Sequence, residues 1–125
     1  MNGKESAPLR LTRAMRLRQS REFADIKARG NRLVRGCLIA NWTMLPPGSL
    51  PRVGVITSKR LGKAVFRCRA RRLLREAFRL RQKDLAAPVA MVLIARASIV
   101  GKPFASVDAD FAAALKQAKL WKLPA

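Results

Sequence analysis

The chain has 125 residues, of which half are hydrophobic, 27 are Lys or Arg, 7 are Asp or Glu and none is His; its formal net charge is +20 at pH 7. This length suits one domain with a real core. The charge far exceeds what solubility needs, so it indicates a polyanionic partner, either a phosphate backbone or an anionic membrane surface. Two isolated cysteines, Cys37 and Cys68, without histidine exclude a zinc site and leave a catalytic thiol without a base.

The N-terminal residues Met1–Pro8 are polar and contain no hydrophobic signal core. No apolar run elsewhere approaches the length of a membrane span, so we expect a cytoplasmic protein with no membrane partner. Basic residues alternate with apolar ones over Leu9–Arg18, and this pattern leaves open an ordered or a flexible arm. We expect one domain over residues 1–125, with flexible ends at about 1–12 and 121–125.

The next segment, Ser20–Arg29, has the pattern of a short amphipathic helix that carries Phe23 on its apolar face. Ser20 can cap its N-terminus. Gly30 would end it in a left-handed conformation, and a loop that contains Arg32 and Arg35 would follow.

Three segments have the pattern of strands. Cys37–Leu45 alternates on one face, and Arg52–Thr57 is rich in β-branched residues. Because a short turn links these two segments, we expect them to pair with each other. Val89–Ala95 is nearly continuously apolar, which indicates a central strand covered on both faces.

The most informative stretch, Ser58–Lys83, lies between the second and third strands. Its apolar residues recur at steps of three and four and would lie on one side of a helix: Phe66, Ala70, Leu73, Leu74, Ala77, Phe78 and Leu80. A second stripe is basic: Arg67, Arg71, Arg75 and Arg79, with Arg72 beside it. Like charges four residues apart repel by a few tenths of a kcal/mol, so helix stability does not explain this stripe and a polyanionic partner does. The preceding loop, Ser58–Lys63, offers basic side chains and free backbone amides to phosphate.

A last helix is expected from Ser106 onward, with Asp108 and Asp110 in its first turn and Lys116 near its end. The element order is therefore α-β-β-α-β-α. It predicts an α+β fold, an α/β sandwich in which helices pack on a single sheet.

The residues do not support an active site carried by the protein. There is no histidine base, the seven acidic residues are scattered, and no Gly-rich nucleotide loop ends in Lys-Ser or Lys-Thr. We expect no catalytic residue, no metal ligand and no cofactor bound by the protein itself.

The segment Gly62–Arg72 reads Gly-Lys-Ala-Val-Phe-Arg-Cys-Arg-Ala-Arg-Arg. It resembles the signature Gly-x-Ala-Val-x-Arg-Asn-Arg-x-Lys/Arg-Arg of the protein subunit of bacterial ribonuclease P. Arg52–Val55 and Ser58–Arg60 are similar to the strand and basic loop of that family, and Val92–Arg96 is similar to its hydrophobic strand ending in Ala-Arg. The likeness covers roughly residues 13–120.

This resemblance implies a division of labour between RNA and protein. A large RNA subunit with Mg²⁺ removes the 5′ leader of precursor tRNA, and the small protein binds that RNA and the single-stranded leader; a protein oligomer is not required. The resemblance also implies a left-handed βαβ crossover, an exception to the usual preference. The positions that match contacts with the RNA subunit are Lys59, Arg60, Lys63, Arg67, Arg69, Arg71, Arg72 and Arg75. The positions that match a leader-binding cleft between the first helix and the sheet are Arg16, Phe23, Lys27, Arg32 and Asn41.

Three positions depart from the family pattern. Cys68 replaces the signature asparagine and cannot both donate and accept hydrogen bonds as an amide does. Lys27 and Asn41 stand where family members often have aromatic residues. Phe23 could stack on a base or could equally be a core residue of the first helix. We therefore expect the leader cleft to depend more on charge than on stacking.

Other functions would share some of these features. A ribosomal-type structural RNA-binding protein without a role in RNA cleavage would have the same size, charge and basic helix, but it need not carry the Gly62–Arg72 signature. A DNA-compacting protein would more often show a dimer arm or an apolar wedge for the minor groove. A membrane-surface helix would need the apolar face that we assign to the sheet.

Overall fold

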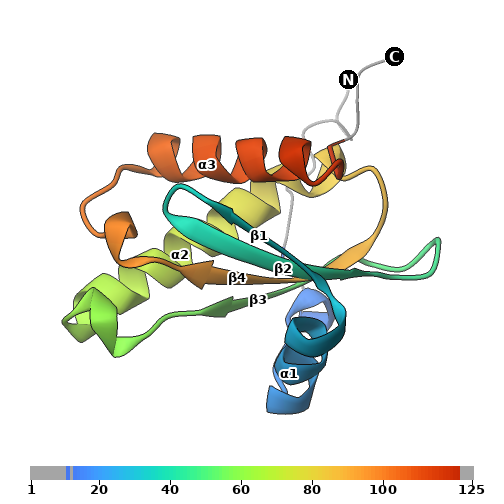
Figure 1. The fold of residues 1–125 in the computed structure, drawn as a ribbon, viewed down its shortest axis with the longest axis horizontal. Helices are drawn as coiled ribbons and strands as arrows, with labels where there is room; N and C mark the ends of the chain where they lie inside the picture. Colours follow the sequence, from blue (N-terminus) through green and yellow to red (C-terminus); the bar gives the residue numbers. More distant parts are fainter. Residues whose placement is uncertain (1–10, 12, 122–125) are drawn as a thin grey trace.

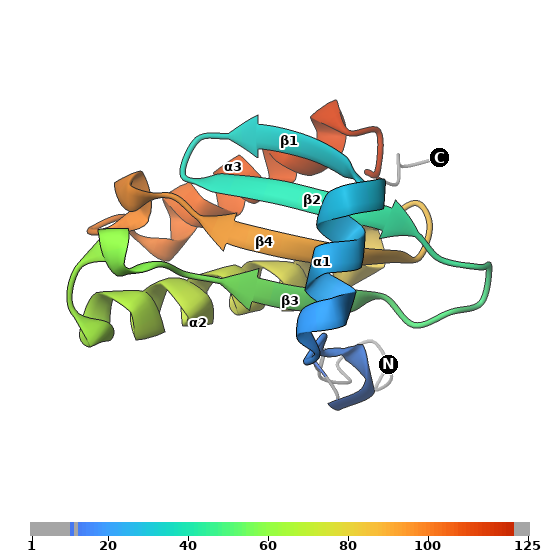
Figure 2. The same ribbon diagram turned by 60° about the horizontal axis from the view of Figure 1, so that its bottom comes forward.

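The computed structural model describes residue 11 and residues 13–121 of the chain, so most of the expected flexible ends lie outside the described residues. The helices and strands are α1 (Ser20–Arg29), β1 (Asn31–Arg35), β2 (Leu38–Met44), β3 (Arg52–Ile56), α2 (Ala64–Arg81), β4 (Val89–Ala95) and α3 (Phe104–Gln117). One four-stranded sheet has α2 and α3 on one face and α1 on the other (Figures 1 and 2). The expected α+β architecture is confirmed.

The strands of this sheet are ordered β1-β2-β4-β3. β2 pairs with β4 antiparallel and β3 pairs with β4 parallel. The prediction that Cys37–Leu45 and Arg52–Thr57, which contain β2 and β3, pair with each other is therefore wrong. The reason is that β4 is the most apolar strand and is buried along nearly its whole length, which places it in the centre. The short segment that links β2 to β3 therefore crosses the end of β4.

A strand, β1, occupies the segment that the sequence predicted to be a loop containing Arg32 and Arg35. It pairs antiparallel with β2 from Asn31↔Trp42 to Arg35↔Leu38, which leaves a two-residue turn that contains Gly36 at φ 54°. Its pattern was hidden because it is an edge strand in which only Leu33 is partly buried. Charged side chains are common on such exposed edges.

The helix α2 connects the two parallel strands β3 and β4. In Figure 2 both strands run leftward, β4 lies above β3, and α2 lies behind the sheet. A helix that crosses behind strands placed in this way makes a left-handed crossover, as the resemblance implied and against the usual preference.

The main core lies between the sheet and the helices α2 and α3. From α2 it takes Ala70, Leu74, Ala77 and Phe78, which belong to the predicted apolar stripe. Phe66 and Leu80, at the two ends of the stripe, are instead 41% and 40% exposed. A smaller cluster packs α1 against the opposite face of the sheet and consists of Leu17, Ile26, Ala90 and Val92.

The ends of the helices differ from the predictions by small amounts. The cap of α1 is Gln19, in a capping box with Glu22, rather than Ser20. Gly30 has φ −86° and is extended, so the left-handed prediction is wrong; a Cβ there would instead lie 2.4 Å from the Ile26 carbonyl oxygen and 2.5 Å from that of Trp42. The last helix, α3, begins at Phe104, before the predicted Ser106.

Both segments flanking the fold are ordered where the structure describes them. The Leu17 N–H donates to the Val53 carbonyl at 2.9 Å, which fixes the predicted basic arm to the edge of β3. Trp121 was expected to be loose, but it forms a β-bridge with Leu85 and lies beneath the cations of Arg81 and Lys116, at 5.2 and 5.0 Å from its ring centroid. No helix of the described residues is long and apolar enough to cross a membrane.

The turn between β1 and β2 is joined to α3 by a polar contact. The Cys37 N–H donates to Asp110 Oδ2 at 3.0 Å, and a side chain at Gly36 would collide with this carboxylate. Cys37 is fully buried, which confirms its predicted place in the core. Burial, together with the Asp110 carboxylate, raises the pKa of the Cys37 thiol to about 12, so this thiol is inert at neutral pH.

Candidate nucleic-acid interface

The eight basic residues expected to contact an RNA subunit lie in one continuous part of the structure. Lys59 and Arg60 belong to a 3₁₀ turn (Lys59–Leu61), Lys63 directly precedes α2, and the five arginines follow on α2 itself. Among the residues that the structure describes, none of the eight forms an ion pair with a carboxylate. No carboxylate of the described residues therefore neutralises their positive charge.

Three of these arginines are held by neutral oxygen atoms. Arg67 donates to the Gly62 carbonyl at 2.6 Å, Arg69 donates to the Lys102 carbonyl at 2.8 Å, and Arg71 donates to Thr57 Oγ1 at 2.7 Å. A neutral acceptor orients a guanidinium but leaves its charge available to an anion. This surface is thus both positively charged and partly preorganised.

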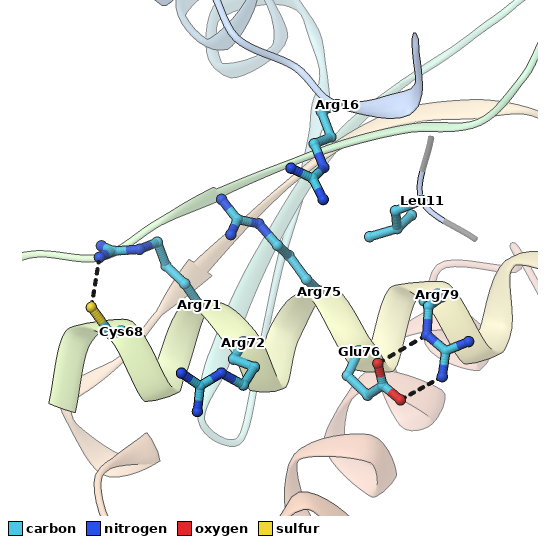
Figure 3. Close-up of a pocket in the computed structure, with 8 residues that line it drawn as sticks. All are labelled: Leu11, Arg16, Cys68, Arg71, Arg72, Arg75, Glu76 and Arg79. Carbon is cyan, nitrogen blue, oxygen red and sulfur yellow. Dashed lines mark hydrogen bonds and ion pairs between the residues drawn. The ribbon is translucent and has the colours of Figure 1, made fainter. Parts of the chain in front are cut away.

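A groove of about 560 Å³ lies between α2 and the N-terminal segment that carries Leu11 and Arg16, and we call it the α2 groove (Figure 3). Its lining residues are Leu11, Arg16, Cys68, Arg71, Arg72, Arg75, Glu76 and Arg79. Burial lowers the pKa of the Arg75 guanidinium, and the positive charges of Arg16 and Arg71 lower it further. The one carboxylate in this lining, Glu76, pairs with Arg79 at 2.6 Å, so Arg16, Arg71 and Arg75 have no carboxylate partner among the described residues. Guanidiniums brought close together in this way are stabilised by a bound anion, and a phosphate fits this requirement.

Arg16 was expected in the leader cleft, and the structure places it between two concave surfaces. It lines the α2 groove, and it also lines a neighbouring hollow of about 340 Å³ with Phe23, Gly54 and Arg75. We call the latter the Phe23 hollow. Arg16 therefore connects the face of α2 with the space beside α1.

The position of Phe23 depends on close packing against β3. The structure leaves room for its ring only because residue 54 is glycine: a Cβ at Gly54 would lie 2.4 Å from Phe23 Cε1. Phe23 is partly buried against the smaller apolar cluster and also lines the hollow. An ion pair between Glu22 and Arg52, with Oε2 and Nη1 2.6 Å apart, fastens the first turn of α1 to β3. Phe23 is thus partly a core residue and partly a surface ring.

The other expected cleft residues lie on α1 and on the strands β1 and β2. Asn41 and Arg32 are cross-strand partners on β2 and β1, two and three strands away from Gly54 in the sheet. Asn41 faces the same side as Val92, beneath α1, and is only 2% exposed. Its Nδ2 has no hydrogen-bond partner among the described residues. Lys27 is exposed on α1.

A third concave surface lies where the parallel strands β3 and β4 end, and sequence reasoning did not include it. This strand-end groove of about 570 Å³ is lined by Ile39, Ser58, Arg60, Ile94, Ala95, Arg96 and Ala97. Arg96 donates to the Gly36 carbonyl at 2.9 Å. The signal for it was available, because Arg96 directly follows a central strand, and ligands of open α/β sheets gather beyond the carboxyl ends of the strands.

Comparison with known proteins decides the family of the chain. The family model "Ribonuclease P" matches residues 11–119. The chain is 36% identical over 115 residues to the ribonuclease P protein component of Chloroflexus aurantiacus, covering 91% of this chain and 84% of that protein. It is 39% identical over 85 residues to that of Desulfatibacillum aliphaticivorans, covering 68% and 71%.

The chain belongs to the ribonuclease P protein family. Solved structures agree in fold: the RNase P protein of Staphylococcus aureus has a TM-score of 0.78 at 23% identity, covering 87% of this chain and 99% of that one. The RNase P protein of Thermotoga maritima has a TM-score of 0.72 at 25% identity, covering 82% and 96%. The resemblance inferred from the Gly62–Arg72 signature is confirmed.

Within the ribonuclease P protein family, the departure at Cys68 has a visible consequence. Cys68 is exposed, and its Sγ accepts a hydrogen bond from Arg71 Nη2 at 3.4 Å (Figure 3). Sulfur is a weak acceptor, so the stronger restraint on Arg71 is the hydroxyl of Thr57. Among the described residues, no group of three or more acidic residues or cysteines could hold a metal ion.

Proposed function

We propose that this chain is the RNA-binding subunit of a ribonuclease P, in which an RNA subunit with Mg²⁺ performs the hydrolysis that removes the 5′ leader of precursor tRNA. Membership of the ribonuclease P protein family makes the chain a component of an endoribonuclease. The single observation that carries the finer proposal is the row of eight basic residues that have no carboxylate partner in the described part of the chain. A cytoplasmic location goes with this role, and the role does not require a protein oligomer.

In this proposal, the face of α2 and the preceding turn bind phosphates of the RNA subunit. The residues that do so are Lys59, Arg60, Lys63, Arg67, Arg69, Arg71, Arg72 and Arg75. The α2 groove supports this assignment because Arg16, Arg71 and Arg75 converge there without a carboxylate partner among the described residues. The protein lowers the repulsion between RNA segments and leaves the bond-breaking step to the RNA.

The single-stranded leader, in the same proposal, lies against the face of the sheet that carries α1. Phe23 offers part of an aromatic ring, and Lys27 offers an exposed ammonium group. The amide of Asn41 is buried beneath α1, so Asn41 offers the leader no exposed group. Arg32 and Arg16 supply charge at the two sides. Because the chain has one aromatic side chain in this set, charge contributes more to leader binding than stacking does.

The salt dependence of RNA binding tests the phosphate contacts. If about six phosphates are contacted, the slope of log affinity against log salt concentration is about −4 to −5. Titration of the protein into a transcribed bacterial ribonuclease P RNA over a salt series measures this slope. A flat profile would contradict the proposal. Arg71→Ala should weaken binding to the RNA subunit generally, while the site of cleavage in precursor tRNA stays the same.

A further inference from the structure

Phe66 departs from the role that its position in the apolar stripe predicted. It is the third residue of α2, and it is 41% exposed instead of packed on the sheet. The neighbouring Val65 is 63% exposed. An exposed ring at the start of a helix contributes little to the core, so burial does not account for a Phe at this position.

The ring of Phe66 is nevertheless held in place. It lies over the turn at Gly62, where an added Cβ would be 3.3 Å from Phe66 Cδ2 and 3.8 Å from Cε2. Gly62 has φ 96°, and its carbonyl accepts the Arg67 guanidinium at 2.6 Å. The turn is thus contacted by the Phe66 ring and by the Arg67 guanidinium. It supports the ring, while a large part of the Phe66 side chain remains exposed to solvent.

The charged residues near Phe66 in the sequence, including those in the first turn of α2, are all basic. Lys63 precedes it, Arg67 follows it, and the first turn of α2 contains no acidic residue. Lys59 and Arg60 lie in the adjoining turn. A supported aromatic face bordered by cations has the composition of a nucleobase-stacking site, in which the cations bind the flanking phosphates.

We infer that Phe66 is a stacking platform for an unpaired base of the RNA subunit, at the N-terminal end of α2. This inference rests on the proposed function and adds one specific contact to it. Every nucleobase has a π-face, so the platform accepts a base of any identity that is unstacked next to a phosphate contacted by Lys63 or Arg67.

Variants at Phe66 test the inference in the full-length chain. The affinity for a transcribed bacterial ribonuclease P RNA is measured for wild type, Phe66→Ala, Phe66→Leu and Phe66→Trp over a salt series. We expect Phe66→Ala and Phe66→Leu to weaken binding about five- to 100-fold and Phe66→Trp to retain it. The slope of log affinity against log salt should stay unchanged, since stacking releases no counterions, whereas Arg67→Ala should reduce its magnitude by about 1.

Leu80→Ala is the matched control, because Leu80 is an equally exposed apolar residue at the other end of the same helix. It should bind RNA like the wild type, and thermal unfolding should show that all variants fold. The inference is overturned if Phe66→Ala binds normally, if Phe66→Leu matches the wild type, or if Leu80→Ala loses as much affinity. Wild-type protein that fails to bind the RNA would contradict the proposed function, whereas wild-type binding with no loss in the Phe66 variants would contradict this inference alone.

Discussion

Replacing Gly54 by alanine should displace Phe23 from the floor of its hollow. The new Cβ would lie 2.4 and 2.5 Å from Cε1 and Cζ of the ring and 3.1 Å from Cβ of Leu17. Carbon atoms in contact prefer about 3.5–4.0 Å, so the ring must move by roughly 1 Å. Overpacking of this kind costs about 1–3 kcal/mol, which lowers the Tm of a chain of this size by roughly 3–12 °C.

The functional consequence of Gly54→Ala should be confined to the leader. We expect the reconstituted complex to lose part of its preference for precursor tRNA over tRNA without a leader, while the affinity of the protein for the RNA subunit alone stays the same. Gly48→Ala is the control: Gly48 has φ 87°, so alanine is strained there, but its Cβ would meet no atom within 4 Å. If Gly54→Ala keeps the Tm and the leader preference of the wild type, the packing of Phe23 on β3 does not control the leader site.

Three further predictions concern single side chains. Thr57→Val removes the hydroxyl that orients Arg71 and should weaken binding to the RNA subunit by about 0.5–1.5 kcal/mol, with no additional loss in an Arg71→Ala background. Burial raises the pKa of Glu22, but the hydrogen bonds it accepts outweigh burial and lower the pKa below its ordinary value of 4.5. Its charge therefore stabilises the fold above about pH 4.5, and this contribution is lost as the pH falls further. Glu22→Gln should lower the Tm at pH 7 and flatten its decline in acid, and a parallel decline would contradict this. A thiol reagent at neutral pH should modify Cys68 in the folded protein and reach Cys37 only after unfolding; rapid modification of both would contradict the burial of Cys37.

The sequence predicted those parts of the fold that have a strong local pattern. The stripe of Ala70, Leu74 and Phe78 identified α2, and the continuous apolar run identified β4 as a covered strand. The strand β1 was missed because an edge strand with arginines on its surface lacks apolar alternation. The pairing of β3 was predicted wrongly because chain proximity suggested β2, whereas the burial requirement of β4 determined the order.

The candidate site was likewise predicted only in part from the sequence. The basic residues of α2 were identified from their spacing, because a helix brings residues at steps of four to one face. The convergence of Arg16 with Arg75 could not be predicted, since it depends on a bridge between the N-terminal segment and β3. The exposure of Phe66 was also unpredictable, because periodicity places a residue on a helix face but does not say where the sheet beneath that face ends.

The central claim, that the protein assists a catalytic RNA, is tested most directly by reconstitution. The purified protein is mixed with a bacterial ribonuclease P RNA at low Mg²⁺ and moderate salt, and cleavage of a precursor tRNA with a 5′ leader is followed. The account predicts faster cleavage than with RNA alone and none with protein alone. Absence of stimulation together with tight binding to ribosomal RNA would contradict it and would favour a structural RNA-binding role.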